Sequence, residues 1–115
     1  PKYKKWCDDY FFLKHRNEAR GIGGIFFDYL HTDDWGRDFE FVQDVGLYFQ
    51  NFVKNTLLTL KDEEWSDDDK QKQLTKRSRY AEFNLLYDRG TKFGLETGGN
   101  IDAILMSMPP LAKWE

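Results

Sequence analysis

The clearest pattern in the sequence is an apolar repeat of three and four residues in the middle of the chain. Its members are Phe39, Val42, Val45, Phe49, Phe52, Val53, Leu57 and Leu60. This spacing places them along one face of an α-helix. A looser repeat predicts a second helix from Lys2 to Glu18, ending before Gly21. Ser66 and the aspartates at 67–69 suit the free N–H groups of a helix start, so a polar helix is expected from there to about Ser78.

Four further segments lack this spacing and predict β-strands. They are 21–28, where Ile and Phe follow glycines, 80–85, where polar and apolar residues alternate, 91–95 and 101–108. Turns are expected at 88–90 and 97–100, which contain Gly and Asp or Asn. The last strand is short, and a short helix is the alternative there.

Composition narrows the function classes. A chain of 115 residues suits one domain, and a net charge of −3 disfavours a phosphate-driven nucleic-acid binder. The single cysteine, Cys7, excludes an internal disulfide framework and a cysteine-based zinc cluster. No apolar run approaches the roughly 20 residues that span a bilayer. Aromatic residues make up 17% of the chain, which indicates a dense core or a surface that a partner or ligand covers.

Common catalytic and cofactor signatures are absent or incomplete. Gly21-Ile22-Gly23 begins like a dinucleotide fingerprint, but Phe26 stands where the third glycine belongs. His15 and His31 lie far apart and lack the spacing of a metal pair. Cys7 fits an inert buried thiol better than a nucleophile.

Two charged groups are candidate ligand sites. Arg16 and Arg20 are four residues apart, so on a helix they would share a face and clamp carboxylates. A solvated face with acidic neighbours is the alternative. Asp88 and Arg89 lie at a predicted strand end, where function is common. A structural salt bridge in a turn is the alternative there.

Five segments of the chain resemble oxygen-dependent coproporphyrinogen III oxidases. They cover both ends of the sequence and skip the middle, about 30–77. The segments are Tyr3-Lys-Lys-Trp-Cys-Asp-Asp-Tyr-Phe, Lys14-His-Arg-Asn-Glu, Arg20-Gly-Ile-Gly-Gly-Ile-Phe-Phe-Asp28, Glu82-Phe-Asn-Leu-Leu-Tyr-Asp-Arg-Gly-Thr-Lys-Phe-Gly-Leu95 and Ile104-Leu-Met-Ser-Met-Pro-Pro110.

The resemblance implies an enzyme of heme biosynthesis. It would convert two propionates of coproporphyrinogen III to vinyl groups, giving protoporphyrinogen IX, with molecular oxygen as co-substrate and no organic cofactor. A divalent metal is an open alternative. The implied fold is α+β, with a large antiparallel β-sheet flanked by α-helices, in a homodimer that associates through Arg79–Trp114. The sequences of the segments resemble those of bacterial members, which implies a cytoplasmic protein, or a mitochondrial one if the source is an animal.

The resemblance also assigns roles to residues. Asp88 and Arg89 would be catalytic, and Asp88 would accept hydrogen bonds from pyrrole N–H groups. Substrate would be bound by Arg20, Gly98, Gly99 and Asn100. His15 aligns with a histidine reported as a metal ligand.

The sequence departs from the family pattern at two places and in extent. Tyr29 follows Asp28 where many members have a second aspartate, and Asn100 stands where a basic residue often occurs. We expect residues 1–115 to be part of a single catalytic domain, its C-terminal portion, with upstream residues and the extreme C-terminus missing. The alternative function is a non-catalytic fragment that dimerises or binds a tetrapyrrole.

Overall fold

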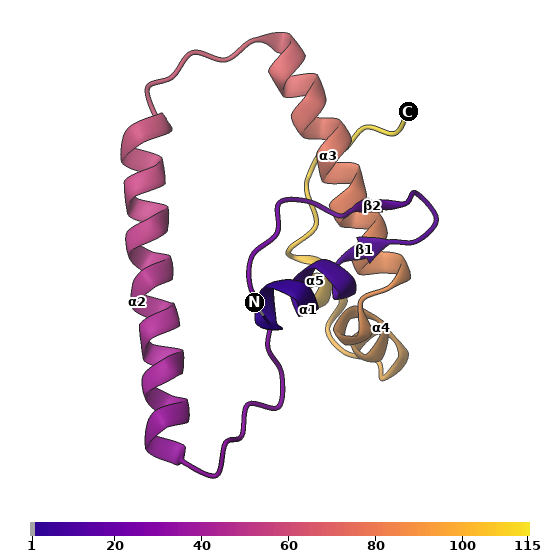
Figure 1. Cartoon of the computed structure of the whole chain (residues 1–115). Coiled ribbons are helices and arrows are strands. Elements are labelled where there is room, and N and C mark those ends of the chain that lie inside the picture. Colours follow the sequence, from indigo (N-terminus) through magenta and orange to yellow (C-terminus); the bar gives the residue numbers. More distant parts are fainter. Residues whose placement is uncertain (1) are drawn as a thin grey trace. The chain divides into compact units, whose positions relative to one another are not determined.

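The computed structural model describes residues 2–115 (Figure 1). Five helices and one two-stranded antiparallel sheet make up this part of the chain. In order they are α1 (Lys2–Tyr10), β1 (Phe12–Leu13), β2 (Glu18–Ala19), α2 (Trp35–Leu60), α3 (Asp67–Leu86), α4 (Arg89–Glu96) and α5 (Ile101–Leu105).

The chain divides into two compact units. The first, here called the two-segment unit, combines residues 1–26 with Ser66–Glu115. The second, here called the α2 unit, is Phe27–Trp65. Each is described by itself below.

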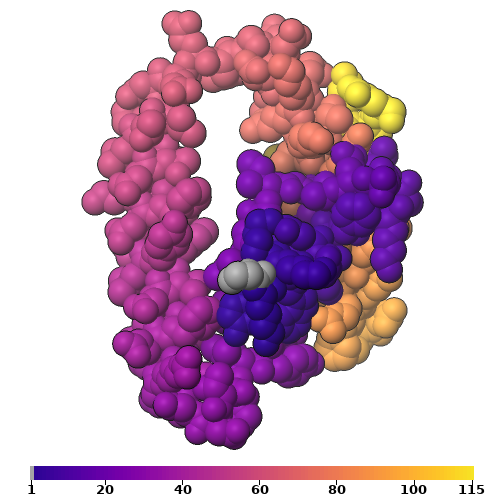
Figure 2. Space-filling model, viewed as in Figure 1, coloured from indigo at the N-terminus to yellow at the C-terminus, as the bar shows by residue number. Residues whose placement is uncertain are grey.

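A short hairpin packed on α3 forms the centre of the two-segment unit. Phe12 pairs with Ala19 and Leu13 with Glu18, and β1 contacts α3 (Figure 1). Leu13 and Phe83 of α3 are almost fully buried. The N-terminal residues, drawn in indigo, lie against the orange residues of α3 and α4 in Figure 2. The hydrophobic core of this unit is therefore where segments distant in sequence meet.

Aromatic rings build most of that core. Tyr10 stacks on Phe26, with ring centroids 4.9 Å apart, and meets Phe83 edge-on at 5.6 Å. Phe11 lies 5.2 Å from both Phe26 and Phe83. Part of the high aromatic content thus serves this core, in the edge-on and stacked arrangements that rings prefer, while other rings such as Trp35 and Tyr48 are exposed.

Two glycines let α4 and α5 approach each other. A Cβ on Gly99 would lie 2.9 Å from the Gly94 carbonyl oxygen, and one on Gly94 would lie 2.9 Å from Ile104 Cδ1. Gly98 has a φ of +72°, which glycine adopts without steric cost. The expected turn at 97–100 is confirmed, and its glycines are required by close packing and backbone conformation.

The α2 unit consists of one long helix and the segments that flank it. Asp34 caps the helix by accepting from the Arg37 N–H, and none of the residues of α2 is buried. Phe49 is 66% exposed and Leu57 60% exposed. The helix predicted from the apolar repeat is confirmed, but within its own unit its apolar face has little to pack against.

The expectation of a large antiparallel sheet is wrong for this chain. The structure is mostly helical, and in residues 2–115 the sheet has only the strands β1 and β2. Of the four segments predicted as strands, 80–85 lies inside α3, 91–95 inside α4 and 101–105 forms α5, while 21–28 forms no helix or strand. Only the short helix left as the alternative for the last segment is confirmed.

The first predicted helix is also too long. It ends at Tyr10, and the chain then turns back as the β1–β2 hairpin, with Asn17 at a φ of +55°. The spacing predicted that Arg16 and Arg20 share a helix face. This prediction is wrong, because neither residue lies on a helix. The capped start at Ser66 is confirmed, because Ser66 and Asp69 form a reciprocal capping box. Within residues 2–115, no helix is long and apolar enough to cross a membrane.

Candidate functional site

Arg20 is placed on the aromatic core directly after β2. Its guanidinium carbon lies 3.9 Å from the centroid of the Phe11 ring, 4.9 Å from that of Tyr80 and 5.0 Å from that of Phe83. A cation over ring faces is attracted by their negative charge density. The rings thus hold the guanidinium in one position.

The charge of the Arg20 guanidinium is not neutralised by a contacting carboxylate among residues 2–115. In the described part of the chain it makes no hydrogen bond and no ion pair, although it is partly buried. Burial lowers its pKa, and the charge of Asp88 raises it by a smaller amount. A partly buried cation without a contacting carboxylate favours binding of an external anion.

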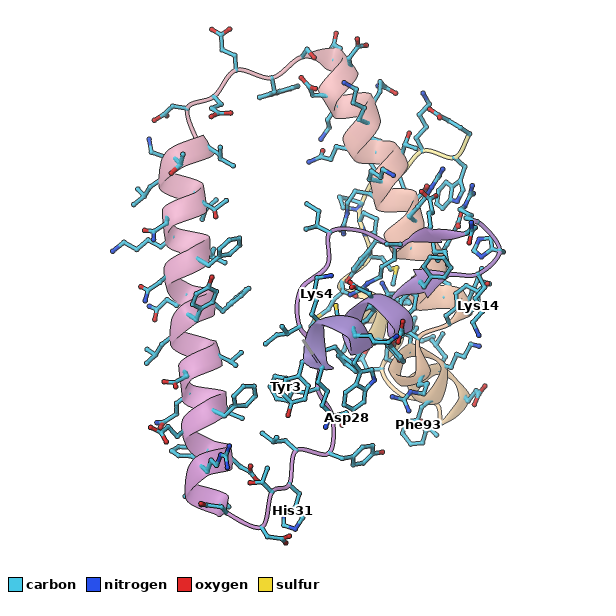
Figure 3. The ribbon with its side chains drawn as sticks, viewed as in Figure 1. Tyr3, Lys4, Lys14, Asp28, His31 and Phe93 are labelled. Atoms are coloured by element: carbon cyan, nitrogen blue, oxygen red, sulfur yellow. The ribbon has the colours of Figure 1, made fainter. Side chains whose placement is uncertain are left out.

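A hollow of about 330 Å³ opens beside Arg20. It lies between α1 and the glycine-rich segment, and its lining includes Cys7, Phe11, Arg20 and residues 21–26. Asp8 also lines it, paired to Lys4 at 2.6 Å. Figure 3 shows Lys4 on α1. The volume is at the small end of ligand pockets, which suits a carboxylate-bearing side chain of a larger ligand.

Asp88 and Arg89 lie at the start of α4, beside Tyr10. Asp88 caps the helix, because its Oδ2 accepts from the Thr91 N–H at 2.7 Å and from the Thr91 hydroxyl at 2.9 Å. The Tyr10 hydroxyl donates to Asp88 Oδ1 over a long 3.4 Å, and the Arg89 guanidinium lies 5.2 Å from the Tyr10 ring centroid. The two residues therefore begin a helix; they do not end a strand, as the sequence had suggested.

His15 lies in the hairpin turn, in a network centred on Glu82. Its Nε2 is 2.8 Å from Glu82 Oε2 and its Nδ1 is 2.9 Å from the Tyr87 hydroxyl. A metal ion at His15 would have to displace one of these partners. Among residues 2–115, no group of three or more histidine, cysteine or acidic side chains is arranged to hold a metal ion.

Gly98, Gly99 and Asn100 form the turn between α4 and α5. The Gly99 N–H donates to the Gly94 carbonyl at 2.9 Å, and the Asn100 side chain accepts from the N–H groups of Asp102 and Ala103. Both groups are thus used within the turn, which leaves their proposed contact with substrate a prediction.

The structure brings together some of the predicted residues and not others. Arg20 and Asp88 interact through charge around the same ring cluster, while His15 lies in the hairpin turn. Sequence reasoning gave no role to two residues of the site. Tyr10 lay within a predicted helix and Glu82 within a predicted strand, and both act through partners more than 60 residues away in sequence.

A guanidinium held on rings presents N–H donors whose geometry matches the oxygens of a carboxylate. Comparison with known proteins gives the family. The sequence profile described as coproporphyrinogen III oxidase matches residues 1–115. The chain belongs to the coproporphyrinogen III oxidase family.

Two curated relatives come from the bacterium Rickettsia bellii, strains OSU 85-389 and RML369-C. Each is named oxygen-dependent coproporphyrinogen-III oxidase, and each is 56% identical over 118 residues. The alignment covers 99% of this chain but 41% of each relative. The chain therefore spans less than half the length of the curated relatives that it matches.

Proposed function

We propose that this chain is the C-terminal portion of the catalytic domain of an oxygen-dependent coproporphyrinogen III oxidase of heme biosynthesis. The protein would act in the cytoplasm and need no organic cofactor. Family membership over residues 1–115 and the names of the relatives support the assignment. The observation that carries it is the Arg20 guanidinium, which lies on three rings and, among residues 2–115, has no contacting carboxylate, while the charge of Asp88 acts on its pKa.

The proposed reaction converts each of two propionates to a vinyl group. The carboxylate carbon leaves as CO2, and a hydride equivalent leaves the carbon next to the pyrrole. Molecular oxygen takes that hydride equivalent together with a proton and becomes hydrogen peroxide. Two such steps on coproporphyrinogen III give protoporphyrinogen IX.

Arg20 suits the role of a propionate anchor. Its fixed guanidinium offers paired N–H donors that match both oxygens of a carboxylate. Phe11 and the exposed glycine-rich backbone beside it leave room for the substituent. Anchoring one propionate would fix which neighbouring propionate reaches the reacting position.

Asp88 suits the role of the carboxylate at the pyrroles. Its Oδ2 is engaged by Thr91, whereas within the described residues 2–115 Oδ1 has the single long contact with Tyr10. A carboxylate can accept about four hydrogen bonds, so Oδ1 retains capacity for pyrrole N–H donors. The negative charge would stabilise positive charge that develops on the pyrrole as it is oxidised, and the same group could act as a base.

The remaining predicted roles are part of the same proposal. Arg89 would assist Asp88, and Gly98, Gly99 and Asn100 would contact substrate after the α4–α5 turn has adjusted. A divalent metal at His15 would require Glu82 or Tyr87 to give way. Homodimer formation through 79–114 is supported by exposed apolar side chains there, including Phe93 on α4 (Figure 3) and Ile101, which are 69% and 61% exposed.

The test of the activity uses the protein expressed from the intact gene. Coproporphyrinogen III would be supplied in air, without oxygen, and in air with a chelator, and the tetrapyrroles separated by chromatography. We expect protoporphyrinogen IX only when oxygen is present. Absence of product from a folded full-length protein would overturn the proposal, and loss of product with the chelator would assign a role to metal.

Asp88 needs variants that separate charge from helix capping. Asp88→Ala removes both, because alanine is a poor N-cap. Asp88→Asn keeps a capping oxygen and removes the charge. We expect both variants to remain dimeric and to lose turnover, and turnover near wild type in Asp88→Asn would remove the carboxylate from the mechanism.

A second candidate function is tetrapyrrole binding without turnover. The hollow beside Arg20 is lined by residues of the two-segment unit, whereas the chain covers 41% of its relatives. Quenching of coproporphyrin III fluorescence by residues 1–115 alone tests this function. Binding that is lost in Arg20→Gln, together with no turnover by the full-length protein, would favour it over the oxidase.

A further inference from the structure

Glu82 accepts hydrogen bonds from more side chains than any other carboxylate in the two-segment unit as described. Arg16 donates to it through both Nε and Nη2 at 2.6 Å, and His15 Nε2 lies at 2.8 Å. Trp114 Nε1 donates to it at 2.9 Å. The Glu82 side chain is only 11% exposed. One carboxylate therefore joins the hairpin turn, helix α3 and the C-terminal segment.

The network continues from Glu82 to the residue before Asp88. A carboxylate only accepts, so His15 must donate to it through Nε2. In the neutral ring Nδ1 then accepts, and it receives the Tyr87 hydroxyl at 2.9 Å. The two rings also stack, with centroids 5.7 Å apart. Glu82, His15 and Tyr87 thus close a loop of contacts at the end of α3.

Tyr87 is the C-cap of α3, and Asp88 is the N-cap of α4. The N–H groups of both residues donate to the Phe83 carbonyl, at 2.8 and 3.0 Å. The direction in which the chain leaves α3 therefore sets where the Asp88 carboxylate lies. The contact of His15 with the Tyr87 side chain therefore restrains the direction in which the chain leaves α3.

The other end of the network reaches Arg20. The hairpin that carries Arg16 also carries β2, and Arg20 follows β2 directly. Glu18 of β2 pairs with Arg79 of α3 at 2.7 Å. The hairpin is thus bound to α3 at two points, Glu82 and Arg79. Because Arg20 follows β2 directly, the same contacts position Arg20.

We propose that Glu82 is a positioning residue that holds Arg20 and Asp88 at their working separation by fastening the hairpin and the α3–α4 corner to one carboxylate. This inference rests on the proposed function of that pair. Arg16 holds the pKa of Glu82 down to about 2, with His15 and Trp114 adding to the effect, so the carboxylate is charged at any physiological pH. Its charge-assisted bonds are therefore permanent rather than a pH switch.

The first variant is Glu82→Gln in the protein from the intact gene. The amide keeps the size of the side chain but replaces one accepting oxygen by a donor, which faces Arg16 or His15. We expect kcat to fall by on the order of 10- to 100-fold with a smaller change in KM, because displaced groups lose alignment before they lose binding. Glu63→Gln, an exposed glutamate of the α2 unit, is the matched control and should retain wild-type kcat.

A second variant keeps the proposal testable if Glu82→Gln folds poorly. Tyr87→Phe removes only the hydroxyl that meets His15 and leaves the Arg16–Glu82 pair in place. It should lower kcat less than Glu82→Gln does, and the double variant should lose less than the two single losses combined. Additive losses would mean that Glu82 does not act through Tyr87 and would overturn the proposal.

Hydrogen exchange separates this inference from the oxidase assignment. Glu82→Gln should speed amide exchange in the hairpin and, beyond it, at the Thr91 N–H that Asp88 accepts. Faster exchange at both places supports the positioning role even if the wild-type protein proves inactive, which would refute only the oxidase. Wild-type kcat in Glu82→Gln, or faster exchange in the hairpin alone, would refute the positioning role.

Discussion

The two units of this chain use their apolar residues in opposite ways. In the two-segment unit, Phe83 is 1% exposed and is surrounded by rings from other segments. In the α2 unit, Phe49 is 66% exposed, and a side-chain hydrogen bond such as that of Thr32 with Asp38 joins near neighbours in sequence. The proposed site residues, Arg20 and Asp88, lie in the unit that is held by long-range contacts. A site needs such contacts, since they fix its side chains.

The largest difference between the units should appear on removing a ring. Phe83→Ala should lower the free energy of unfolding by about 3–5 kcal/mol, because it empties a packed position. Phe49→Ala should change it by less than about 0.5 kcal/mol in the 115-residue chain, because the ring is already in water. Urea denaturation of both variants measures the two changes in the free energy of unfolding. Changes of similar size would contradict the difference between the units.

Acid should weaken the two-segment unit through Glu82. Its pKa is lowered from 4.5 to about 2 by Arg16, His15 and Trp114, so the stabilisation is complete above pH 4.5. It is lost as the pH falls through 4.5 towards 2, because protonation removes the charge that these donors bind. Hydrogen bonds to a charged group suggest a loss of about 2–3 kcal/mol.

The measurement is the urea midpoint from pH 7 down to about pH 2, in wild type and Glu82→Gln. The variant should lack most of the drop. A wild-type drop that persists unchanged in Glu82→Gln would assign acid sensitivity to other carboxylates. Asp38 in the α2 unit also has a lowered pKa, caused by Thr32, and its effect has the same sign.

Glycine substitutions should have opposite signs in the two units. Gly99→Ala would place a Cβ 2.9 Å from the Gly94 carbonyl oxygen, so it should destabilise by about 1–3 kcal/mol. A Cβ on Gly46 of α2 meets nothing within 4 Å, so Gly46→Ala should stabilise by about 1 kcal/mol through helix propensity. Thermal unfolding checks the signs, and a stabilising Gly99→Ala would contradict the packing described for α4 and α5.

The smallest effect is expected at the surface of α1. Lys5 pairs with Asp9 at 2.6 Å, but both side chains are more than half exposed. Lys5→Gln should cost only about 0.3–0.5 kcal/mol and less at high salt. A cost comparable to that of Gly99→Ala would show that membership of the two-segment unit, and not burial, decides the effect of a substitution.

Local signals predicted part of the fold well. The repeat from Phe39 to Leu60 and the capped start at Ser66 were correct, since neither depends on distant residues. The alternation at 80–85 was misread as a strand because a run of six residues can show it on a helix that is buried on more than one side. Ala81, Phe83 and Asn84 are buried together on α3. Helix caps at Asp88 and Asn100 were available signals that the turn interpretation passed over.

The candidate site was harder to predict than the helices. Resemblance to the family named Arg20 and Asp88, and the structure places both beside one ring cluster, Arg20 on Phe83 and Asp88 against Tyr10. Pattern and spacing could not supply Tyr10 or Glu82, because their partners lie on other elements and no local period reports such contacts. The proposed pairing of Arg16 with Arg20 failed for the same reason, since a hairpin interrupted the helix that the spacing assumed.

Arg20 of the two-segment unit is the proposed substrate-binding cation. The most direct measurement compares Arg20→Gln with Arg37→Gln, an exposed arginine of α2, in the full-length protein turning over coproporphyrinogen III. Loss of a charged partner for a carboxylate should lower kcat/KM by about 100-fold in Arg20→Gln. Arg37→Gln should stay within about twofold of wild type, as expected for an exposed side chain. Equal values of kcat/KM for Arg20→Gln and wild type would contradict the account.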